Sequence, residues 1–551
     1  MTAPRQMPRR KRHALHATPA LGLTLFSLGL AAFAGGKTFA QDAVQDHPQE
    51  HRLPPALYQA ASGDPHLDVI PRTPAEAARI AKVTAWPEDF TKAQGFEQNP
   101  AGASTVRARK DADAFSQPSA NMPFESEMRF KLGNGLFRKL WVASPASTLA
   151  SDGLGPLYNA RGCQRCHLKD GRGHVPEGRD DLATSMFLRI GVPLLADETA
   201  ADPQARAAAI EGYLATRGDA TYGGQLQDFA STGLAGEGRM DITYSEETVA
   251  LSGGETVSLR RPIYNVSDLR YGAMEPRAQI SPRVAPQMIG LGLIEAIPAA
   301  DILALADPDD ADGDGISGRP NVVWSAQFDR PMLGRFGLKA GKPTVHEQSA
   351  AAFAGDMGLS TSLHPDPWGD CTAAQAACRA APHGDKDARV FEVDDAALDL
   401  VTFYSRNLAV PARVDAGDPQ VLRGKEVFFE IGCASCHAPR FVTHRLRDQP
   451  EHSFQLIAPY SDFLLHDMGE GLADGLPEAR AAGHEWRTAP LWGIGKTAQV
   501  SGHTQFLHDG RARSLLEAVV WHGGEAAPAR DAVVALPPEA RADLIRFLES
   551  L

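Results

Sequence analysis

Apolar residues recur at helical spacing in several stretches of the chain. One covers Thr73–Val83, and others cover residues 285–306 and 397–408. Two more helices are expected near the C-terminus: one that Asp418 caps, and one over residues 538–551 that packs back on it. The pattern therefore predicts a mainly α fold.

A different pattern interrupts these helical stretches between about residues 220 and 270. Apolar and polar positions alternate in RMDITYS, ETVALSG and TVSLRRPIY, and Gly-rich turns separate these segments. We expect a small β insertion of short strands inside a helical domain. The 51 Gly and 40 Pro residues indicate long loops as well.

The first 40 residues resemble an export signal. The basic residues Arg9–Arg12 precede an apolar run over residues 20–34, and small residues allow cleavage after Ala34 or Ala40. The alternative, a membrane anchor, fits less well because the run is shorter than the roughly 20 residues of a spanning helix. We expect a periplasmic protein with no membrane span after cleavage.

The charge of the chain argues against one class of partner. Loss of residues 1–40, which hold six basic and no acidic residues, lowers the net charge from −13 to −19. So acidic a protein is not expected to bind nucleic acid, and a basic protein partner would suit it, although many solvated surfaces are simply acidic.

The six cysteines fall into three close pairs, and two of the pairs precede a histidine. Cys163 and Cys166 precede His167, and Cys433 and Cys436 precede His437. Two thiols at this spacing can bind both vinyl groups of one haem while the adjacent histidine ligates the iron. A thioredoxin-like pair would not explain the histidine, and a zinc site would have to join motifs some 270 residues apart. We predict two covalently bound haem c groups.

The third pair, Cys371 and Cys378, lies in a polar, Ala-rich loop. In an oxidising compartment a local disulfide is expected, with two free thiols as the alternative.

The motifs divide the chain. We expect a signal peptide (1–40), an N-terminal extension (41–120), a first haem domain with the β insertion (121–410) and a C-terminal cytochrome c domain (411–551). The fold class is thus mainly α, with two cytochrome c-like haem domains.

Most of residues 125–551 resembles the bacterial di-haem oxidoreductases related to di-haem cytochrome c peroxidases. The segments that carry this resemblance are GLGPLYNARGCQRCH, SPRVAPQMIGLGLIEAIP, DADGDGISGRPN, LGRFGLKA, YSDFLLHDMGEGLAD, EWRTAPLWGIG and LHDGRARSLLEAVVWHGGEA.

The resemblance implies a second ligand for the C-terminal haem iron. In the relatives, the fourteenth residue after the histidine of a Phe-His-Asp-Gly segment ligates this iron and is usually Met. Counting from His508 leads to His522 here. Two imidazoles generally give a lower potential than His and Met. The alternative is that His522 caps the helix end, with His466 and Met468 as reserve ligands.

For the first haem, the relatives hold a glutamine and then Glu-Met-Gly, whose carboxylate handles peroxide protons. Gln348 matches the glutamine, and Asp356 matches the glutamate if two residues are deleted between them. A carboxylate facing water is the alternative for Asp356. By the same analogy Arg335, with Phe336 and Lys339, approaches this site.

Two features of the relatives have no clear counterpart here. Leu338 stands where an aromatic residue between the haems would be expected. His174, Met274 and Met288 do not settle the distal ligand of the first haem.

A calcium loop is also expected. Asp310, Asp312 and Asp314, followed by Gly315, match its first half, and the relatives hold calcium between their haem domains. Position twelve is Asn321 rather than Glu, so a polar turn is the alternative.

The resemblance implies a peroxidase-like enzyme. Electrons from a small cytochrome or cupredoxin would enter at the C-terminal haem and reach peroxide, or another small substrate, at the N-terminal haem. The alternative function is a non-catalytic electron-transfer protein that serves a partner redox or iron-handling system.

Overall fold

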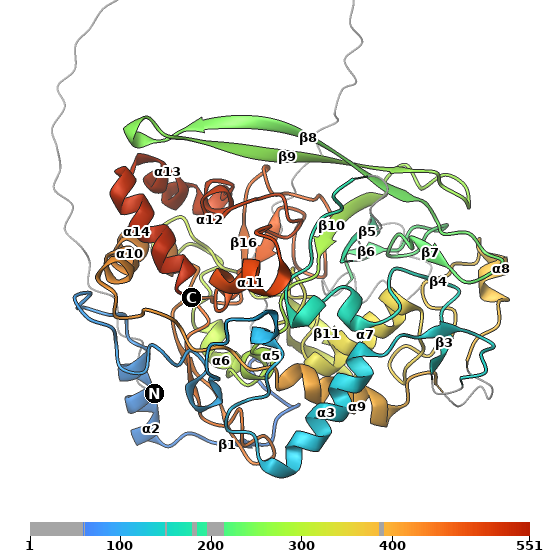
Figure 1. Ribbon diagram of the computed structural model, residues 1–551, viewed down its shortest axis with the longest axis horizontal. Helices are drawn as coiled ribbons and strands as arrows, with labels where there is room; N and C mark the ends of the chain where they lie inside the picture. The colour runs from blue at the N-terminus through green and yellow to red at the C-terminus, as the bar shows by residue number, and fades with distance from the viewer. Residues whose placement is uncertain (1–58, 60, 149–150, 179–184, 195–213, 385–390) are drawn as a thin grey trace, which may run out of the picture. The chain divides into compact units, whose positions relative to one another are not determined.

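Most helices are short and lie toward the outside of the molecule (Figure 1). The computed structural model describes residue 59 and residues 61–148, 151–178, 185–194, 214–384 and 391–551, which belong to the compact unit His51–Leu551. The predicted signal peptide lies outside the described residues. The helices are α2 (Pro74–Thr84), α3 (Phe124–Arg138), α5 (Leu291–Glu295), α6 (Ala299–Leu303), α7 (Val345–Met357), α8 (Ala376–Arg379), α9 (Asp395–Arg406), α10 (Pro419–Glu430), α11 (Thr497–Ser501), α12 (Leu515–Val520), α13 (Ala527–Ala535) and α14 (Pro538–Glu549).

Strands form many small sheets. They are β1 (Val69–Ile70), β2 (Val142–Ala143), β3 (Asp152–Leu154), β4 (Leu157–Tyr158), β5 (Met186–Pro193), β6 (Thr216–Arg217), β7 (Phe229–Ala230), β8 (Arg239–Ala250), β9 (Thr256–Ser267), β10 (Gln279–Val284), β11 (Val322–Ser325), β12 (Arg330–Leu333), β13 (Phe441–Val442), β14 (Arg445–Leu446), β15 (Leu456–Ile457), β16 (Leu465–Asp467) and β17 (Glu485–Arg487).

The predicted mainly α fold class is wrong. The structure is 30% helix and 19% strand, spread over many small sheets. One physical reason is that Pro and Gly interrupt the helices: Pro298 separates α5 from α6, where continuous helical texture was expected. Another is that some strand pairs join distant segments, such as Val69 with Leu446 and Leu157 with Ala230, which no local pattern reveals.

Three helix predictions are confirmed. Thr73 caps α2 and forms a capping box with Glu76. Asp418 caps α10 by accepting hydrogen bonds from two backbone N–H groups. The last helix, α14, packs on α10 so closely that a side chain at Gly424 would collide with the backbone of Asp543.

The β insertion forms one long hairpin. Strands β8 and β9 pair antiparallel along their whole length, from Arg239 opposite Ser267 to Ala250 opposite Thr256. Figure 1 shows this hairpin above α12 and α13 on one side and β10 on the other. Arg513, in the segment before α12, forms an ion pair with Glu246 of the hairpin, so the hairpin is held over the C-terminal part of the chain.

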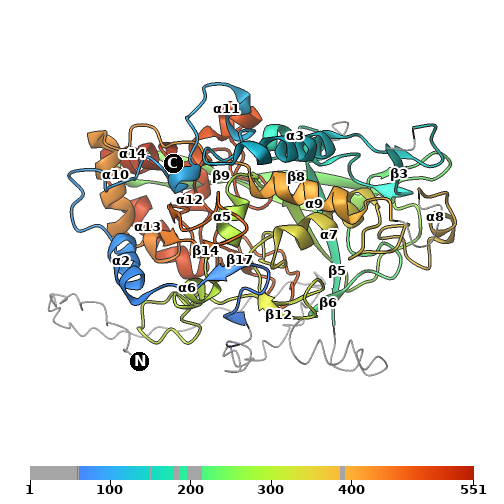
Figure 2. The ribbon, with the colours of Figure 1, turned by 90° about the horizontal axis from the view of Figure 1, so that it is seen from below.

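Helices α3, α7 and α9 enclose an apolar core around Phe130, Phe353 and Tyr404. Figure 2 shows α3 and α9 side by side, with α3 at the outer edge. No helix in the described part of the chain has the length and apolar character of a membrane span.

Candidate functional site

The first haem turn, Cys163–His167, is a 3₁₀ turn in which the backbone N–H groups of Cys166 and His167 bond to the carbonyl of Cys163. His167 Nδ1 lies 2.8 Å from the carbonyl oxygen of Pro286. Because a carbonyl only accepts, Nδ1 carries the proton and Nε2 keeps its lone pair. Burial lowers the pKa of His167 to about 4, so the ring is neutral at pH 7.

The second haem turn, Cys433–His437, repeats this arrangement. It follows α10, and Gly432 makes the sharp exit from the helix with φ of 90°. His437 Nδ1 lies 2.8 Å from the carbonyl oxygen of Tyr460, and burial lowers the pKa of His437 to about 4. A neutral histidine that donates its Nδ1–H to a backbone carbonyl is the usual state of a metal ligand. Both turns therefore fit a haem iron bound at Nε2.

His522 is close enough to His437 to act on it electrostatically, since it is one of the groups that lower the pKa of His437. It stands just beyond the end of α12, and its Nδ1 lies 2.8 Å from the carbonyl oxygen of Ala518. Burial lowers the pKa of His522 as well. Because a carbonyl only accepts, Nδ1 carries the proton and Nε2 of His522 keeps its lone pair.

The reserve ligand His466 lies beside the second haem turn, with its Nδ1 3.6 Å from Cys436 Sγ, but carboxylates engage both of its nitrogens. Its Nε2 lies 2.8 Å from Asp462 and its Nδ1 lies 2.7 Å from Glu525. Although burial favours the neutral ring, these carboxylates hold the pKa of His466 well above its ordinary value. Both nitrogens donate, so neither offers a lone pair to iron. The other reserve, Met468, is half-buried in the apolar cluster that contains Trp521.

Asp356 lies beside the first haem turn. Burial, and then the nearby charge of Asp356, raises the pKa of Cys163 to about 12. The backbone carbonyl of Asp356 accepts hydrogen bonds from the N–H groups of Asn159 and Ala160, at 2.9 and 3.0 Å. These bonds tie the end of α7 to the segment that enters the turn. Burial raises the pKa of Asp356, and Arg189 opposes this shift.

The other two candidates lie apart from this carboxylate. Gln348 is half-buried two turns earlier on α7. Arg335 is 1% exposed and donates to the carbonyls of Ile294 and Ile297 and to Asp64 Oδ1, at 3.0, 2.6 and 2.6 Å. The structure therefore brings Asp356, and not Arg335, to the first haem turn.

The sequence did not indicate Gln225, which holds Asp356 in place. Gln225 Nε2 donates to Asp356 Oδ1 at 3.0 Å and to Asn159 Oδ1 at 2.5 Å. Asn159 Nδ2 donates in turn to Asp228 Oδ2 at 3.0 Å, and burial raises the pKa of Asp228 to about 6. Gln225 is 131 residues from Asp356, so no local signal links them.

Aromatic residues lie between segments of the two haem regions. Trp486 stacks on His508 with ring centroids 3.9 Å apart, and Lys339 Nζ lies 4.5 Å from the Trp486 ring. The backbone N–H of Val284, two residues before Pro286, donates a hydrogen bond to the carbonyl oxygen of His508. Leu338, which stands where an aromatic residue was expected, packs in the same apolar cluster as Trp486.

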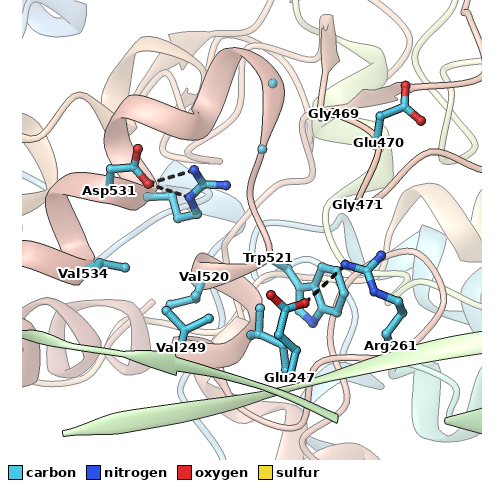
Figure 3. A pocket seen from close by; sticks show the side chains of 14 residues that line it. Glu247, Val249, Arg261, Gly469, Glu470, Gly471, Val520, Trp521, Asp531 and Val534 are labelled. Carbon is cyan, nitrogen blue, oxygen red and sulfur yellow. Dashed lines mark hydrogen bonds and ion pairs between the residues drawn. The ribbon is translucent and has the colours of Figure 1, made fainter. Parts of the chain in front are cut away.

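A pocket of about 460 Å³ lies beside Trp521, the neighbour of His522. Figure 3 shows Trp521, Glu247 and Arg261 on one side of it, with Asp531 and Val534 across from them. The guanidinium of Arg261 lies 5.1 Å from the Trp521 ring. The acidic and basic side chains around the pocket nearly balance, so its charge does not select one class of ligand.

The structure brings together only the carboxylates from the first half of the expected calcium loop. Asp310, Asp312 and Asp314 bring carboxylate oxygens within 4.8 Å of one another. Asn321 faces away, since its Nδ2 donates to the carbonyl of Lys339 at 2.7 Å. Calcium takes about six to eight oxygen ligands, and three carboxylates do not define such a site.

Cys371 and Cys378 form a disulfide, and both are buried.

Comparisons with known proteins cover residues 96–551 of the chain. A family model described as "Di-haem oxidoreductase, putative peroxidase" matches residues 96–551. No curated protein matches the chain. Among solved structures, a chain of hydrazine synthase from Kuenenia stuttgartiensis, pressurised with xenon, is 18% identical over 34% of this chain and 64% of its own length. Its TM-score of 0.20 is too low to compare the folds.

Proposed function

Because this chain belongs to the di-haem oxidoreductase family, we propose that it is an exported c-type enzyme that reduces peroxide at the haem of the first turn. Electrons would enter through the haem of the second turn from a small cytochrome or cupredoxin. The reaction takes two electrons and two protons and converts hydrogen peroxide into two waters. The signal-like N-terminus supports a periplasmic location.

The observation that carries this proposal is the matched geometry of the two turns. In each, two cysteines precede a neutral histidine whose Nδ1 lies 2.8 Å from a backbone carbonyl. Each turn can thus attach one haem c covalently and offer Nε2 of His167 or His437 to its iron. Bound haem would supply the electron-transfer and peroxide chemistry.

The two turns differ in what lies near them. His522 offers a second imidazole in the region of His437, so these two residues would hold the iron of the second haem. The ionisable groups that act on Cys163 are Asp356 and Asp170, carboxylates that do not compete strongly for haem iron. This difference supports electron transfer at the second turn and substrate chemistry at the first.

Asp356 would act as the acid and base. Its carboxylate would take a proton from one peroxide oxygen and return it to the oxygen that leaves as water. Burial raises its pKa, which favours holding that proton, and the Gln225 amide fixes the direction of the carboxylate through Oδ1. Gln225 is therefore a positioning residue in this mechanism.

The test is steady-state peroxide reduction by purified holoprotein with a reduced cytochrome or cupredoxin as donor. We expect Asp356→Asn to lower kcat about 100-fold or more, the usual contribution of general acid–base catalysis, with unchanged haem content. Asp415→Asn, whose side chain is 55% exposed, serves as the control. A variant Asp356→Asn with wild-type kcat would contradict the role of this carboxylate.

A further inference from the structure

Three carboxyl groups lie close to Asp356 and have no part in the mechanism above. They belong to Asp228, Asp370 and Glu237, which we call the carboxyl cluster. Glu237 is 1% exposed, and the other two are half-buried. Asp228 directly precedes β7 and Asp370 lies in the loop before α8, and Figure 1 shows both elements on the side of the molecule away from α10 and α14. Carboxyl groups are rarely buried together, so their position here points to a role.

The segment Gly224–Asp228 lies along the end of α7. Gln225 Nε2 donates to Asp356 Oδ1 at 3.0 Å, and Gln227 Nε2 donates to the carbonyl of Gly355 at 2.9 Å. The two amides therefore hold this segment against the residue that carries the proposed acid and base.

The backbone of the same segment binds two members of the cluster. Asp370 Oδ2 accepts hydrogen bonds from the N–H groups of Gly224 and Gln225, at 2.6 and 3.0 Å. Glu237 Oε2 accepts from the N–H group of Gln227 at 2.7 Å. Both carboxyl groups are thus fixed beside the amides that contact α7.

The disulfide loop completes this arrangement. Asp370 directly precedes Cys371, which is bonded to Cys378. Within the loop, Gln375 Nε2 donates to Glu237 Oε1 at 2.5 Å. The loop therefore supplies one carboxyl group of the cluster and a partner of another.

Asp228 is linked to Asp356 through two side-chain amides. Its Oδ2 accepts from Asn159 Nδ2 at 3.0 Å, and Asn159 Oδ1 accepts from Gln225 Nε2, which also bonds to Asp356. These bonds fix the distance between the two carboxyl groups. They do not themselves carry a proton, because an amide nitrogen keeps its hydrogens.

Two amide oxygens of the segment call for another donor. Gln225 and Gln227 are 1% and 2% exposed, and the Oε1 atom of each has no hydrogen-bond partner within the described part of the chain. Buried amide oxygens are almost always hydrogen-bonded, to protein or to ordered water. Water is a donor that fits among carboxyl groups, and it carries protons between them.

The surrounding charges favour protonated carboxyl groups. Arg189 acts on Asp356 and Asp370, and Arg239 acts on Asp228. Two cations among this many carboxyl groups leave part of the negative charge unbalanced, and like charges in a buried site raise one another's proton affinity.

The members of the cluster differ in how tightly they hold a proton. Burial raises the pKa of Glu237 to about 8, and the charges of Asp370 and Asp228 add to this shift. Burial raises the pKa of Asp228 and of Asp370 to about 6. Burial also raises the pKa of the neighbouring Tyr222 and Tyr271, so they stay neutral. Near pH 7, Glu237 holds a proton and the two aspartates exchange theirs.

We propose that the carboxyl cluster is the proton reservoir for peroxide reduction, a role that rests on the proposed function. The reaction breaks the O–O bond, forms two O–H bonds, and takes two electrons from the donor protein and two protons. Asp356 only moves a proton between the two peroxide oxygens, so the two new protons come from elsewhere. They pass from the cluster to Asp356 through water at the Gln225 and Gln227 amide oxygens, and solvent replaces them at Asp228 and Asp370.

Peroxide kinetics of the purified holoprotein separate the reservoir from Asp356. We expect Asp228→Asn to leave kcat/KM for peroxide unchanged, because Asp356 alone moves the proton when the O–O bond breaks. Its kcat should fall at least about tenfold, since each turnover needs two protons from the cluster. Asp415→Asn, whose side chain is 55% exposed, is the control and should change neither constant.

Each failure gives a different pattern. A wild-type protein that reduces no peroxide overturns the proposed function and the reservoir with it. If Asp356→Asn lowers kcat and Asp228→Asn does not, the proposed function stands and the reservoir is overturned. A loss of both constants in Asp228→Asn would mean that Asp228 only supports the position of Asp356, which also overturns the reservoir.

Infrared spectra of the holoprotein give a readout that does not depend on turnover. The protonated carboxyl group of Glu237 should give a C=O stretching band that Glu237→Gln removes. Asp228→Asn removes a charge that raises the pKa of Glu237, so the band should disappear at a lower pH than in the wild type. A band that titrates at the same pH in both proteins would show that the groups share no proton and would overturn the proposal. Far-ultraviolet circular dichroism and haem absorbance verify that each variant is folded.

Discussion

At the scale of single residues, the buried carboxyl group of Glu237 holds its proton unusually tightly. Burial raises the pKa of Glu237 to about 8, despite hydrogen bonds from the Gln227 N–H and from Gln375 Nε2. Glu237 is 1% exposed. The native state thus binds this proton more tightly than the unfolded state does.

This pKa predicts a pH dependence of stability. The contribution of Glu237 is fully present below its unfolded pKa of about 4.5 and is lost as the pH rises through about 8. We expect the free energy of unfolding of Glu237→Gln to fall less than that of the wild type as the pH rises. The difference should be a few kcal/mol at most, since one pKa unit corresponds to about 1.4 kcal/mol. Urea unfolding from pH 5 to pH 8.5 measures it.

Glu247→Gln on the exposed part of β8 is the control for that comparison. The free energy of unfolding of this variant should change with pH as that of the wild-type protein does. The interpretation fails if Glu237→Gln and Glu247→Gln give the same pH dependence.

At this scale the sequence indicates the chemistry that short motifs carry, and the assignments to particular residues stay predictions. The spacing of cysteines and histidines indicated both haem turns, and a resemblance pointed to His522 and Asp356. It could not find Gln225, Pro286 or Tyr460, since each contacts its histidine or carboxylate across 23 to 131 residues. Only the folded chain brings such partners together.

At the scale of elements, the C-terminal end of α7 sets the position of Asp356. Gly358 ends this helix with φ of 64°, a left-handed conformation that favours glycine. A side chain at Gly358 would lie 2.8 Å from the Cα of Gly155, in the segment that leads to the first haem turn. The helix end and this segment are therefore packed backbone to backbone.

We expect Gly358→Ala to lower the free energy of unfolding by more than about 1 kcal/mol, because strain and overlap add. Gly254→Ala tests strain alone, since φ is 82° and a side chain there has no neighbour within 4 Å. Thermal unfolding followed by circular dichroism compares the two. If the two variants lose the same free energy of unfolding, the overlap with Gly155 is relieved by a small shift and adds nothing to the backbone strain.

The elements themselves were predictable where a local signal existed. Asp418 caps its helix as its sequence position indicated, and the helix expected over Thr73–Val83 is present as α2 with Thr73 as its cap. The β insertion was recognised, but as short strands rather than one hairpin of two 12-residue strands. The fold class was wrong because two-residue strands paired across long separations leave no period in the sequence.

At the scale of the whole molecule, residues 61–120 join the C-terminal part of the chain through buried ion pairs. Glu97 binds Arg413 at 2.7 Å and Lys425 at 3.0 Å, and all three side chains are 1% exposed. Asp64 binds Arg335 in the same way. The segment expected as an extension thus contacts the core of the molecule.

Glu97→Gln should lower the free energy of unfolding by about 3–5 kcal/mol, because it leaves two buried cations without their counter-charge. Glu549→Gln, at a surface pair 3.9 Å long, should change it by about 0.5 kcal/mol or less. Denaturant unfolding at pH 7 gives both values. A loss of similar size in the two variants would mean that the segment contributes little to stability.

The central claim concerns two haem sites with different axial ligation. Low-temperature EPR and absorption spectra of the holoprotein, with and without cyanide and hydrogen peroxide, test it most directly. The account predicts one low-spin haem with two imidazole ligands, His437 and His522, and one haem that binds cyanide and responds to peroxide. Two low-spin haems that neither compound changes, in the oxidised and half-reduced states, would contradict it and leave an electron-transfer protein.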